Sequence, residues 1–176
     1  ERDLEKICSV GYAVAVNSGT SANMLALASL LNLGKIQPGD EVIVPAATFS
    51  SVVSPIYQLG LVPVYVDVTD TDWFMSVDEV AGAISNKTKV IMPVYNLGFP
   101  GEIEKLVDLA KEKNLQILED CCEAHGAERQ GIKLGAYGDL SALSFFVAHN
   151  ITTGEGGMIF THDEELDTSL RELREF

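Results

Sequence analysis

At Ala13-Val14-Ala15-Val16-Asn17-Ser18-Gly19-Thr20-Ser21-Ala22-Asn23 the sequence passes from an apolar, strand-like run into a long helical run. The small residues at this junction allow backbone N–H groups and hydroxyls to face an anion at the helix N-terminus, where the helix dipole also favours negative charge. An ordinary Ser or Thr N-cap has the same pattern. The stretch therefore predicts a strand, a turn and a helix, and it leaves open whether the turn binds an anion.

The same alternation of apolar runs and amphipathic helical runs continues to the end of the chain. Strands are expected at 13–16, 41–44, 62–68, 90–94, 116–119, 141–145 and 158–161. Helices are expected at 21–33, 51–59, 77–84, 103–113 and 164–174. Strands that are apolar on both faces and separated by helices indicate a mostly parallel sheet between helices. Because we find neither an internal repeat nor a linker, we expect a single α/β domain over residues 1–176.

Charge and cysteine content narrow the classes of function. Twelve Lys and Arg against 26 Asp and Glu give a net charge of −14, whereas nucleic acids and anionic membranes require a cationic surface. No apolar run approaches the roughly 18 residues of a membrane span. The three cysteines, two of them adjacent, make a poor disulfide framework. We therefore expect a cytoplasmic protein that binds neither nucleic acid nor membrane.

A second polar feature comes at the end of a predicted strand, at Leu118-Glu119-Asp120. In open α/β sheets, ligands bind beyond the carboxyl ends of the strands. A carboxylate there can pair with a protonated ring nitrogen, as pyridoxal enzymes require for their electron sink. A strand-terminal carboxylate that caps the next loop has the same sequence, so both interpretations stand at this point.

The third polar feature follows another predicted strand. It consists of Ser144-Phe145-Phe146-Val147-Ala148-His149-Asn150 and, a few residues later, Gly154-Glu155-Gly156-Gly157. A hydroxyl, an ionisable side chain and a glycine-rich turn come together here. Histidine is suited to proton transfer near neutral pH, although a lone histidine is more often structural than catalytic.

Together these features resemble the DegT/DnrJ/EryC1/StrS family of nucleotide-sugar aminotransferases. The motifs that carry the resemblance are, in order, Gly19-Thr20-Ser21-Ala22-Asn23, Val44-Pro45-Ala46-Ala47-Thr48-Phe49, Glu119-Asp120, Gly138-Asp139 before Ser144-Phe145, and Gly154-Glu155-Gly156-Gly157. The resemblance implies the aspartate-aminotransferase-like fold, PLP fold type I, with this chain as the large domain. Because the sequence begins with Glu1 and stops inside an apparent helix, we expect a fragment whose small C-terminal domain lies beyond Phe176.

Position by position, the resemblance implies contacts to pyridoxal 5′-phosphate. The residues at the cofactor phosphate are Gly19, Thr20, Ser21 and Ser144. Phe49 matches the aromatic residue that stacks on the pyridine ring, and Asp120 matches the carboxylate that pairs with its nitrogen. Glu123 falls where many relatives carry a glutamine near the cofactor hydroxyl, and it also fits a helix-start carboxylate. His125 is open to either a structural or a functional role.

One position departs from the aminotransferases of this family. Their lysine, five residues after the serine of the Ser-Phe motif, is replaced by His149, and the nearest upstream lysine, Lys133, lies in a polar loop. Imidazole cannot form the Schiff base that a lysine amine forms with pyridoxal. The resemblance therefore implies that pyridoxal 5′-phosphate or pyridoxamine 5′-phosphate is bound without a covalent link, with the pyridoxamine form as the working species.

This replacement resembles the 3-dehydratase branch of the family, which includes GDP-4-keto-6-deoxymannose 3-dehydratase and CDP-4-keto-6-deoxyglucose 3-dehydrase. Val147 stands in place of a proline common in that branch, and Asn150 in place of a second histidine. The resemblance implies an enzyme of deoxysugar biosynthesis. In such an enzyme, His149 would act as both acid and base in removing the C3 hydroxyl of a nucleotide-linked 4-keto-6-deoxyhexose. The alternatives are an aminotransferase-like protein with a substituted lysine and a non-catalytic cofactor-binding protein.

Cys122 raises the question of a second cofactor. In the branch member that works with a reductase, cysteines bind a [2Fe–2S] cluster, and one of them lies just after the ring-nitrogen aspartate, where Cys122 falls. Because Cys8 and Cys121 have no matching spacing, we favour a small buried cysteine and predict no metal site. The resemblance further implies a homodimer, a nucleotide-sugar substrate and glutamate as amino donor.

Overall fold

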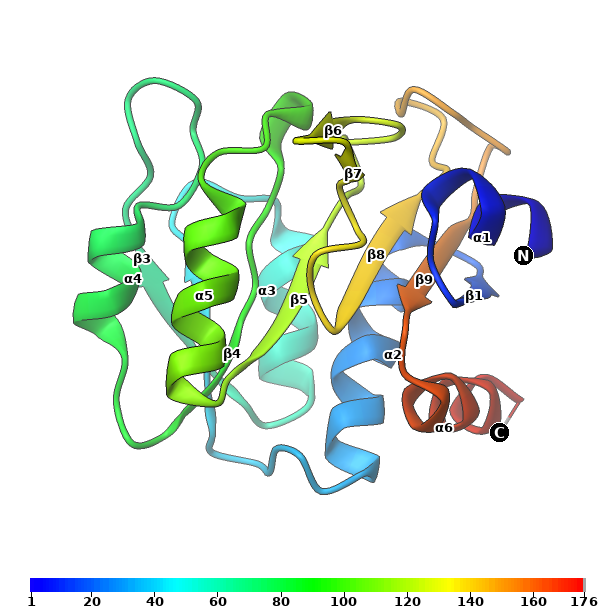
Figure 1. Cartoon of the computed structure of the whole chain (residues 1–176). Coiled ribbons are helices and arrows are strands. Elements are labelled where there is room, and N and C mark those ends of the chain that lie inside the picture. The colour runs from blue at the N-terminus through cyan, green and yellow to red at the C-terminus, as the bar shows by residue number, and fades with distance from the viewer. Residues whose placement is uncertain (176) are drawn as a thin grey trace.

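The computed structural model describes residues 1–175 as a seven-stranded sheet with helices on both faces (Figure 1). The strands of this sheet are β1 (Tyr12–Val16), β2 (Glu41–Pro45), β3 (Val62–Val66), β4 (Thr88–Ile91), β5 (Gln116–Asp120), β8 (Leu140–Ser144) and β9 (Gly157–Thr161). The helices are α1 (Arg2–Cys8), α2 (Gly19–Asn32), α3 (Ser50–Gln58), α4 (Val77–Ala83), α5 (Ile103–Lys113) and α6 (Glu164–Glu175). A short 3-10 turn, η1 (Asn96–Gly98), and a hairpin of β6 (Glu128–Arg129) and β7 (Ile132–Lys133) lie beyond the carboxyl ends of the parallel strands.

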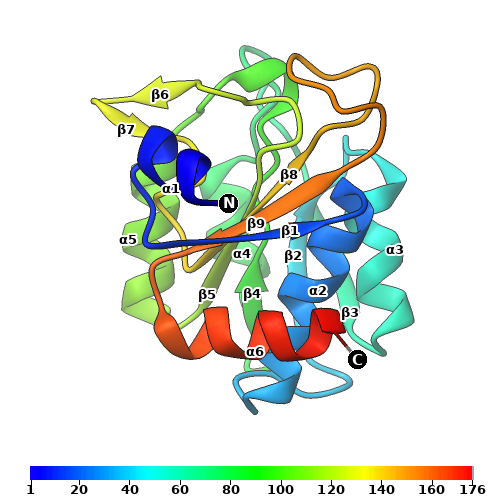
Figure 2. The ribbon, with the colours of Figure 1, turned by 90° about the vertical axis from the view of Figure 1, so that its right-hand side faces the viewer.

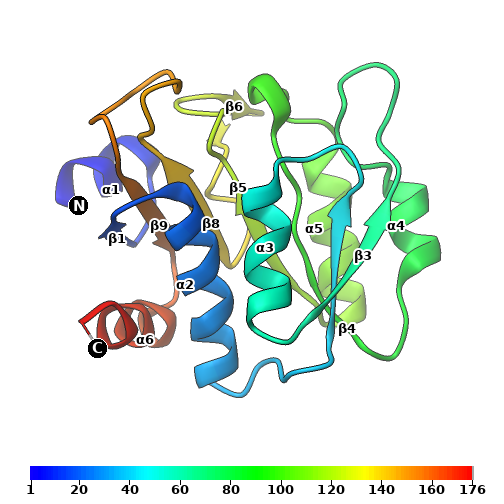
Figure 3. The same cartoon turned by 180° about the vertical axis from the view of Figure 1, so that it is seen from behind.

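The sheet is mostly parallel, as the sequence predicts. Its strand order is β1-β9-β8-β5-β4-β2-β3. The pairs among β8, β5, β4, β2 and β3 are parallel, whereas β9 is antiparallel to both of its neighbours. The carboxyl ends of the parallel strands therefore meet at one edge, where the N-terminus of α2 also lies (Figure 3).

Two hydrophobic cores, one on each face of the sheet, hold the helices in place. Val42 and Val44 of β2 pack in the core shared with α2, α3 and α6, whereas Ile43 packs in the core shared with α1, α4 and α5. Figure 2 shows these layers edge-on. Successive side chains of a strand point to opposite faces, so a strand covered on both sides must be apolar at every position.

Two strands end earlier than the sequence suggests. β3 stops at Val66, and as an edge strand it leaves Val62 and Tyr65 44% and 50% exposed, so it is not buried on both faces. β4 stops at Ile91, and Val94 makes only an isolated bridge to β5. Pro93 lies between Ile91 and Val94, and it has no N–H to donate to a neighbouring strand. Its carbonyl accepts from the Asp120 N–H at 2.8 Å.

Neither α1 nor the β6–β7 hairpin is among the elements predicted from the sequence. The hairpin turns at Gln130-Gly131, and both residues have positive φ (51° and 79°), as a tight two-residue turn requires. Its strands have only two residues each, too few to show a period. Among residues 1–175, no helix has the length and apolar character needed to cross a membrane.

Candidate functional site

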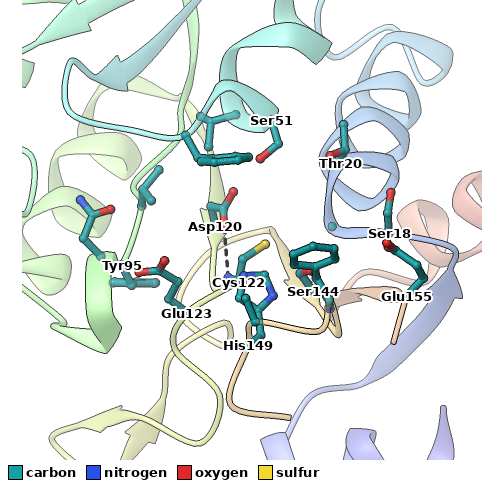
Figure 4. A pocket seen from close by; sticks show the side chains of 17 residues that line it. Ser18, Thr20, Ser51, Tyr95, Asp120, Cys122, Glu123, Ser144, His149 and Glu155 are labelled. Atoms are coloured by element: carbon teal, nitrogen blue, oxygen red, sulfur yellow. Dashed lines mark hydrogen bonds between the residues drawn. The ribbon is translucent and has the colours of Figure 1, made fainter. Parts of the chain in front are cut away.

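A cavity of about 480 Å³ opens at the carboxyl ends of the parallel strands (Figure 4). Seven of the eight residues predicted from the sequence line it, although they come from four separate segments of the chain. These are Gly19, Thr20, Phe49, Asp120, Glu123, Ser144 and His149. The sheet therefore gathers the three polar features of the sequence around one space.

The first wall of the cavity is the N-terminus of α2. Ser18 is the N-cap, and its Oγ accepts from the Ser21 N–H at 3.0 Å. The next two N–H groups, of Gly19 and Thr20, occupy helix positions that have no intrahelical acceptor. A Cβ on Gly19 would lie 2.6 Å from the Cβ of Ser144, so the glycine lets α2 approach β8. The capping and anion-binding interpretations are therefore compatible, because different residues serve each.

Ser21 is the predicted site residue that the structure places elsewhere. Its hydroxyl accepts from Ser18 Oγ at 3.0 Å, and it is not among the residues that line the cavity. Its assignment to an anion stays a prediction.

Asp120 forms the floor of the cavity with a residue that sequence reasoning passed over, Asn23. The Asp120 side chain is 3% exposed, and its Oδ2 accepts from Asn23 Nδ2 at 2.8 Å. Its Oδ1 accepts from the Cys122 N–H at 3.0 Å (Figure 4). Asn23 is itself fully buried one turn into α2. The sequence signal that could have predicted this role is an asparagine on an otherwise apolar helix face.

Behind this floor, Glu119 anchors three segments of the chain. The side chain is fully buried. Its Oε2 accepts from the Tyr95 hydroxyl (2.5 Å) and the Gly135 N–H (2.9 Å), and its Oε1 accepts from the N–H groups of Tyr137 (2.9 Å) and Gly138 (2.6 Å). Burial raises the pKa of Glu119, and the four donors oppose that rise. Three of the four partners are backbone N–H groups, which can only donate, so both carboxylate oxygens of Glu119 serve as acceptors.

Tyr95 links this anchor to the cavity. It lines the cavity, its hydroxyl bonds to Glu119, and its backbone N–H donates to the carbonyl of Asp120 at 3.1 Å. Its ring stacks on Phe74 with centroids 5.7 Å apart. Burial, followed by the nearby charge of Glu119, raises the pKa of the Tyr95 phenol well above its usual value. Tyr95 therefore serves as a neutral hydrogen-bond donor.

Aromatic and acidic side chains form the rim. Phe49, at the N-cap position of α3, is 75% exposed, so its face is free to cover a bound ring. Glu123 lies in a turn, not at the start of a helix, which corrects the helix-start interpretation. Its Oε2 accepts from the Leu97 N–H at 2.8 Å. Glu155, which sequence reasoning did not single out, lines the same cavity near Ser18 (Figure 4).

His149 faces the cavity from the loop after β8 (Figure 4). Its Nδ1 is buried and has no partner among the residues that the structure describes. No lysine or arginine of residues 1–175 lines the cavity. Lys133, the nearest upstream lysine in sequence, instead donates to the Gly126 carbonyl (3.2 Å) and the Glu128 carboxylate (2.7 Å). Among the described residues, the imidazole of His149 is therefore the basic group that faces the cavity.

Two of the three cysteines lie in a hydrophobic core, and the third lies at the cavity. Cys8 and Cys121 lie in the core beside α1, α4 and α5, whereas Cys122 lines the cavity. Burial, followed by the charge of Asp120, raises the pKa of the Cys122 thiol, so it stays protonated. Within residues 1–175, no group of three His, Cys, Asp or Glu side chains is arranged to hold a metal ion.

A mostly parallel sheet with this cavity at its carboxyl edge is the architecture of the aspartate-aminotransferase-like large domain, PLP fold type I. The chain belongs to the DegT/DnrJ/EryC1/StrS aminotransferase family, whose model matches residues 1–176. The family and the fold expected from the sequence are thereby confirmed.

Individual relatives carry more than one activity. The chain is 47% identical over 157 residues to GDP-perosamine synthase of Escherichia coli O157:H7, covering 89% of this chain and 42% of that protein. It is 39% identical over 168 residues to GDP-4-keto-6-deoxy-D-mannose 3-dehydratase of Yersinia pseudotuberculosis, covering 94% and 43%. The structure of the E. coli 3-dehydratase with bound hydrated PLP superposes with a TM-score of 0.93 at 34% identity, covering 97% and 44%. The chain thus spans less than half the length of these relatives.

Glu119→Gln tests the anchor. The amide places an N–H₂ group against backbone donors and removes a charge that four donors stabilise, so we expect a loss of about 3 kcal/mol in the free energy of unfolding. Chemical unfolding monitored by circular dichroism measures it. Glu128→Gln, which removes an exposed carboxylate paired with Lys133, is the control and should leave the midpoint nearly unchanged. Equal effects of the two substitutions would contradict the anchoring role.

Gly157→Ala tests the packing of the α2 N-terminus. A Cβ on Gly157 would overlap the Ser18 carbonyl group and crowd the N–H of Gly19. We expect a loss of about 1–3 kcal/mol, together with weaker binding of pyridoxal 5′-phosphate measured by fluorescence titration. Gly82→Ala is the control, because Gly82 lies in α4 with open space around it. That substitution should stabilise the protein by about 0.5–1 kcal/mol.

Proposed function

We propose that this chain is the cofactor-binding large domain of a nucleotide-sugar 3-dehydratase. Such an enzyme removes the C3 hydroxyl of a 4-keto-6-deoxyhexose. The observation that carries the proposal is the occupant of one position: an imidazole, His149, faces the cavity, and no lysine of residues 1–175 lines it. A transaminase of this fold needs an amine there to hold and release its cofactor. A dehydratase needs only a proton carrier.

The cavity fits a pyridoxal-type cofactor held without a covalent link. The helix N-terminus and the hydroxyls of Thr20 and Ser144 suit its phosphate. The face of Phe49 suits its ring. The buried carboxylate of Asp120, fixed by Asn23, suits a protonated ring nitrogen. When bound, the cofactor supplies an electron sink next to the carbon from which a proton must be taken.

We assign Glu123 to the hydroxyl group on the cofactor ring. It lines the cavity from the turn that follows β5, and its Oε2 accepts from the Leu97 N–H. The carboxylate is thereby fixed by a backbone donor, and its second oxygen can accept from a hydroxyl.

The chain's own contribution to the reaction is proton transfer at His149. A neutral imidazole nitrogen accepts the proton from carbon, and the resulting imidazolium donates it to the departing C3 hydroxyl. One side chain can do both, because an imidazole nitrogen that has taken up a proton can give it to the leaving group. Phe146, whose ring meets His149 edge-on at 6.1 Å, limits where that imidazole can move.

The cavity is lined by negative charges, which indicates that cations from outside this chain help to bind the substrate. Asp120, Glu123 and Glu155 line it, and no lysine or arginine of residues 1–175 does. A diphosphate-linked sugar brings further negative charge, which Arg or Lys must offset. We propose that a second subunit of a homodimer and a C-terminal domain supply those cations, and that glutamate restores the amine form of the cofactor.

A second candidate function is an aminotransferase-like activity that proceeds without the lysine. The observation in its favour is the similarity of the chain to GDP-perosamine synthase. The two candidates differ in their product. Loss of the C3 oxygen from a 4-keto-6-deoxy nucleotide sugar supports dehydration, whereas a stable amino sugar contradicts it.

His149→Asn tests the proton carrier. We expect kcat for the full-length protein to fall by about 10³-fold, because an amide cannot carry the proton, while cofactor affinity changes little. Turnover is followed by mass spectrometry of the nucleotide sugar. His162→Asn, which alters an exposed histidine just after β9, should keep full activity. Undiminished turnover by His149→Asn would overturn the assignment.

His149→Lys tests whether position 149 lies at the reactive carbon of the cofactor. A lysine amine within reach of that carbon condenses with pyridoxal 5′-phosphate, so borohydride reduction should leave the cofactor covalently attached to this residue. Peptide mass spectrometry reads the site directly. His162→Lys should show no attachment. If neither variant is labelled although both bind the cofactor, the proposed placement of His149 is wrong.

A further inference from the structure

A second histidine lies beside His149. His125 belongs to the turn that follows β5, and its ring centroid is 6.3 Å from that of His149, with the planes inclined at 51°. His125 stacks on Phe145 at 5.7 Å. The next residue, Phe146, meets the ring of His149 edge-on. Two neighbouring phenylalanines at the end of β8 thus hold two imidazoles that come from different segments.

The nitrogen atoms of this pair are unusual. Both ring nitrogens of His125 and the Nδ1 of His149 are buried, and no side chain among the described residues pairs with them; the backbone of Ser144 lies near enough to His125 to raise its pKa. A buried polar atom left unpaired costs about 1–3 kcal/mol, so native proteins keep few of them. Such atoms on two adjacent rings point to a shared task for the rings, since packing alone would be served better by apolar side chains.

The groups around His125 leave His149 as its main electrostatic neighbour. Cys122, on the same turn, carries a neutral thiol, because burial and Asp120 raise its pKa. Glu123 points its carboxylate at the Leu97 N–H. Lys133 reaches the turn from β7, but its ammonium is paired with Glu128 and donates to the Gly126 carbonyl.

Burial, followed by the charge of His149, lowers the pKa of His125 below its usual 6.5. His125 therefore stays neutral near pH 7 in the folded protein. Because the unfolded chain takes up the proton first, protonation of His125 destabilises the fold as pH drops below 6.5 toward the lowered pKa.

We propose that His125 is a positioning residue of the site, which pairs with His149 so that the two imidazoles carry one proton between them. This inference rests on the proposed function of His149. Two imidazolium ions at this separation in a water-poor site repel each other, so protonation of one ring keeps the other neutral. Because His125 is the ring with the lowered pKa, it is the one that stays neutral while His149 takes a proton during the reaction. Once His149 holds that proton, the neutral His125 leaves it free to pass on.

The pairing is tested by measuring each imidazole separately in the full-length protein. Deuterium exchange at the ring Cε1–H, read by peptide mass spectrometry, follows the protonation of individual histidines whatever the size of the protein. We expect the His125 midpoint to rise by about 1 pH unit in His149→Asn. His162→Gln, the control, should leave it unchanged. His149→Gln provides a second variant against local disturbance. An unchanged His125 midpoint in both His149 variants would overturn the proposal.

A kinetic measurement separates positioning from simple packing. His125→Phe keeps a ring to stack on Phe145 and removes the titrating group. We expect kcat to fall about tenfold with little change in KM, because His149 loses the imidazole that faces it. A lowered melting temperature with an unchanged kcat would show a structural role only and would overturn the proposal. If the exchange midpoint of His125 moves but no nucleotide sugar is turned over, the pair stands and the proposed function fails.

Discussion

The site depends on a buried carboxylate that four hydrogen-bond donors hold in place. Glu119 and Asp120 are consecutive in β5, so their side chains point to opposite faces of the sheet. Glu119 fixes Tyr95 and the loop at 135–138 on one face. Asp120 accepts from Asn23 of α2 on the other. The end of a single strand therefore ties helix α2 on one face to Tyr95 and the 135–138 loop on the other, and it forms the floor of the cavity.

This construction gives the cavity an acidic character. Three carboxylates, from Asp120, Glu123 and Glu155, line it, and the ionisable nitrogen facing them among the described residues is an imidazole. A phosphate bound here gains from helix N–H groups and hydroxyls more than from full positive charges. No lysine of residues 1–175 lines the cavity, and this favours dehydration over transamination in the proposed function.

Several features of the site could be predicted from sequence because their chemistry is local. Small residues between a strand and a helix mark the phosphate wall, and a carboxylate that ends a buried strand marks the floor. Asn23 and Tyr95 could not be assigned in this way, because their roles exist only through partners 97 and 24 positions away. The length of β4 likewise depended on Pro93, whose missing N–H an apolar pattern does not register.

The sequence by itself determined the alternation of strands and helices, the family, and the replacement of a lysine by His149, since each is written in residue type and spacing. Only the tertiary structure decided that seven predicted residues share one cavity, that Ser21 turns to Ser18, and that His125 stands beside His149. The reason is physical. Strand order and helix packing set the distances between segments, and no local pattern encodes which loops meet at the edge of the finished sheet.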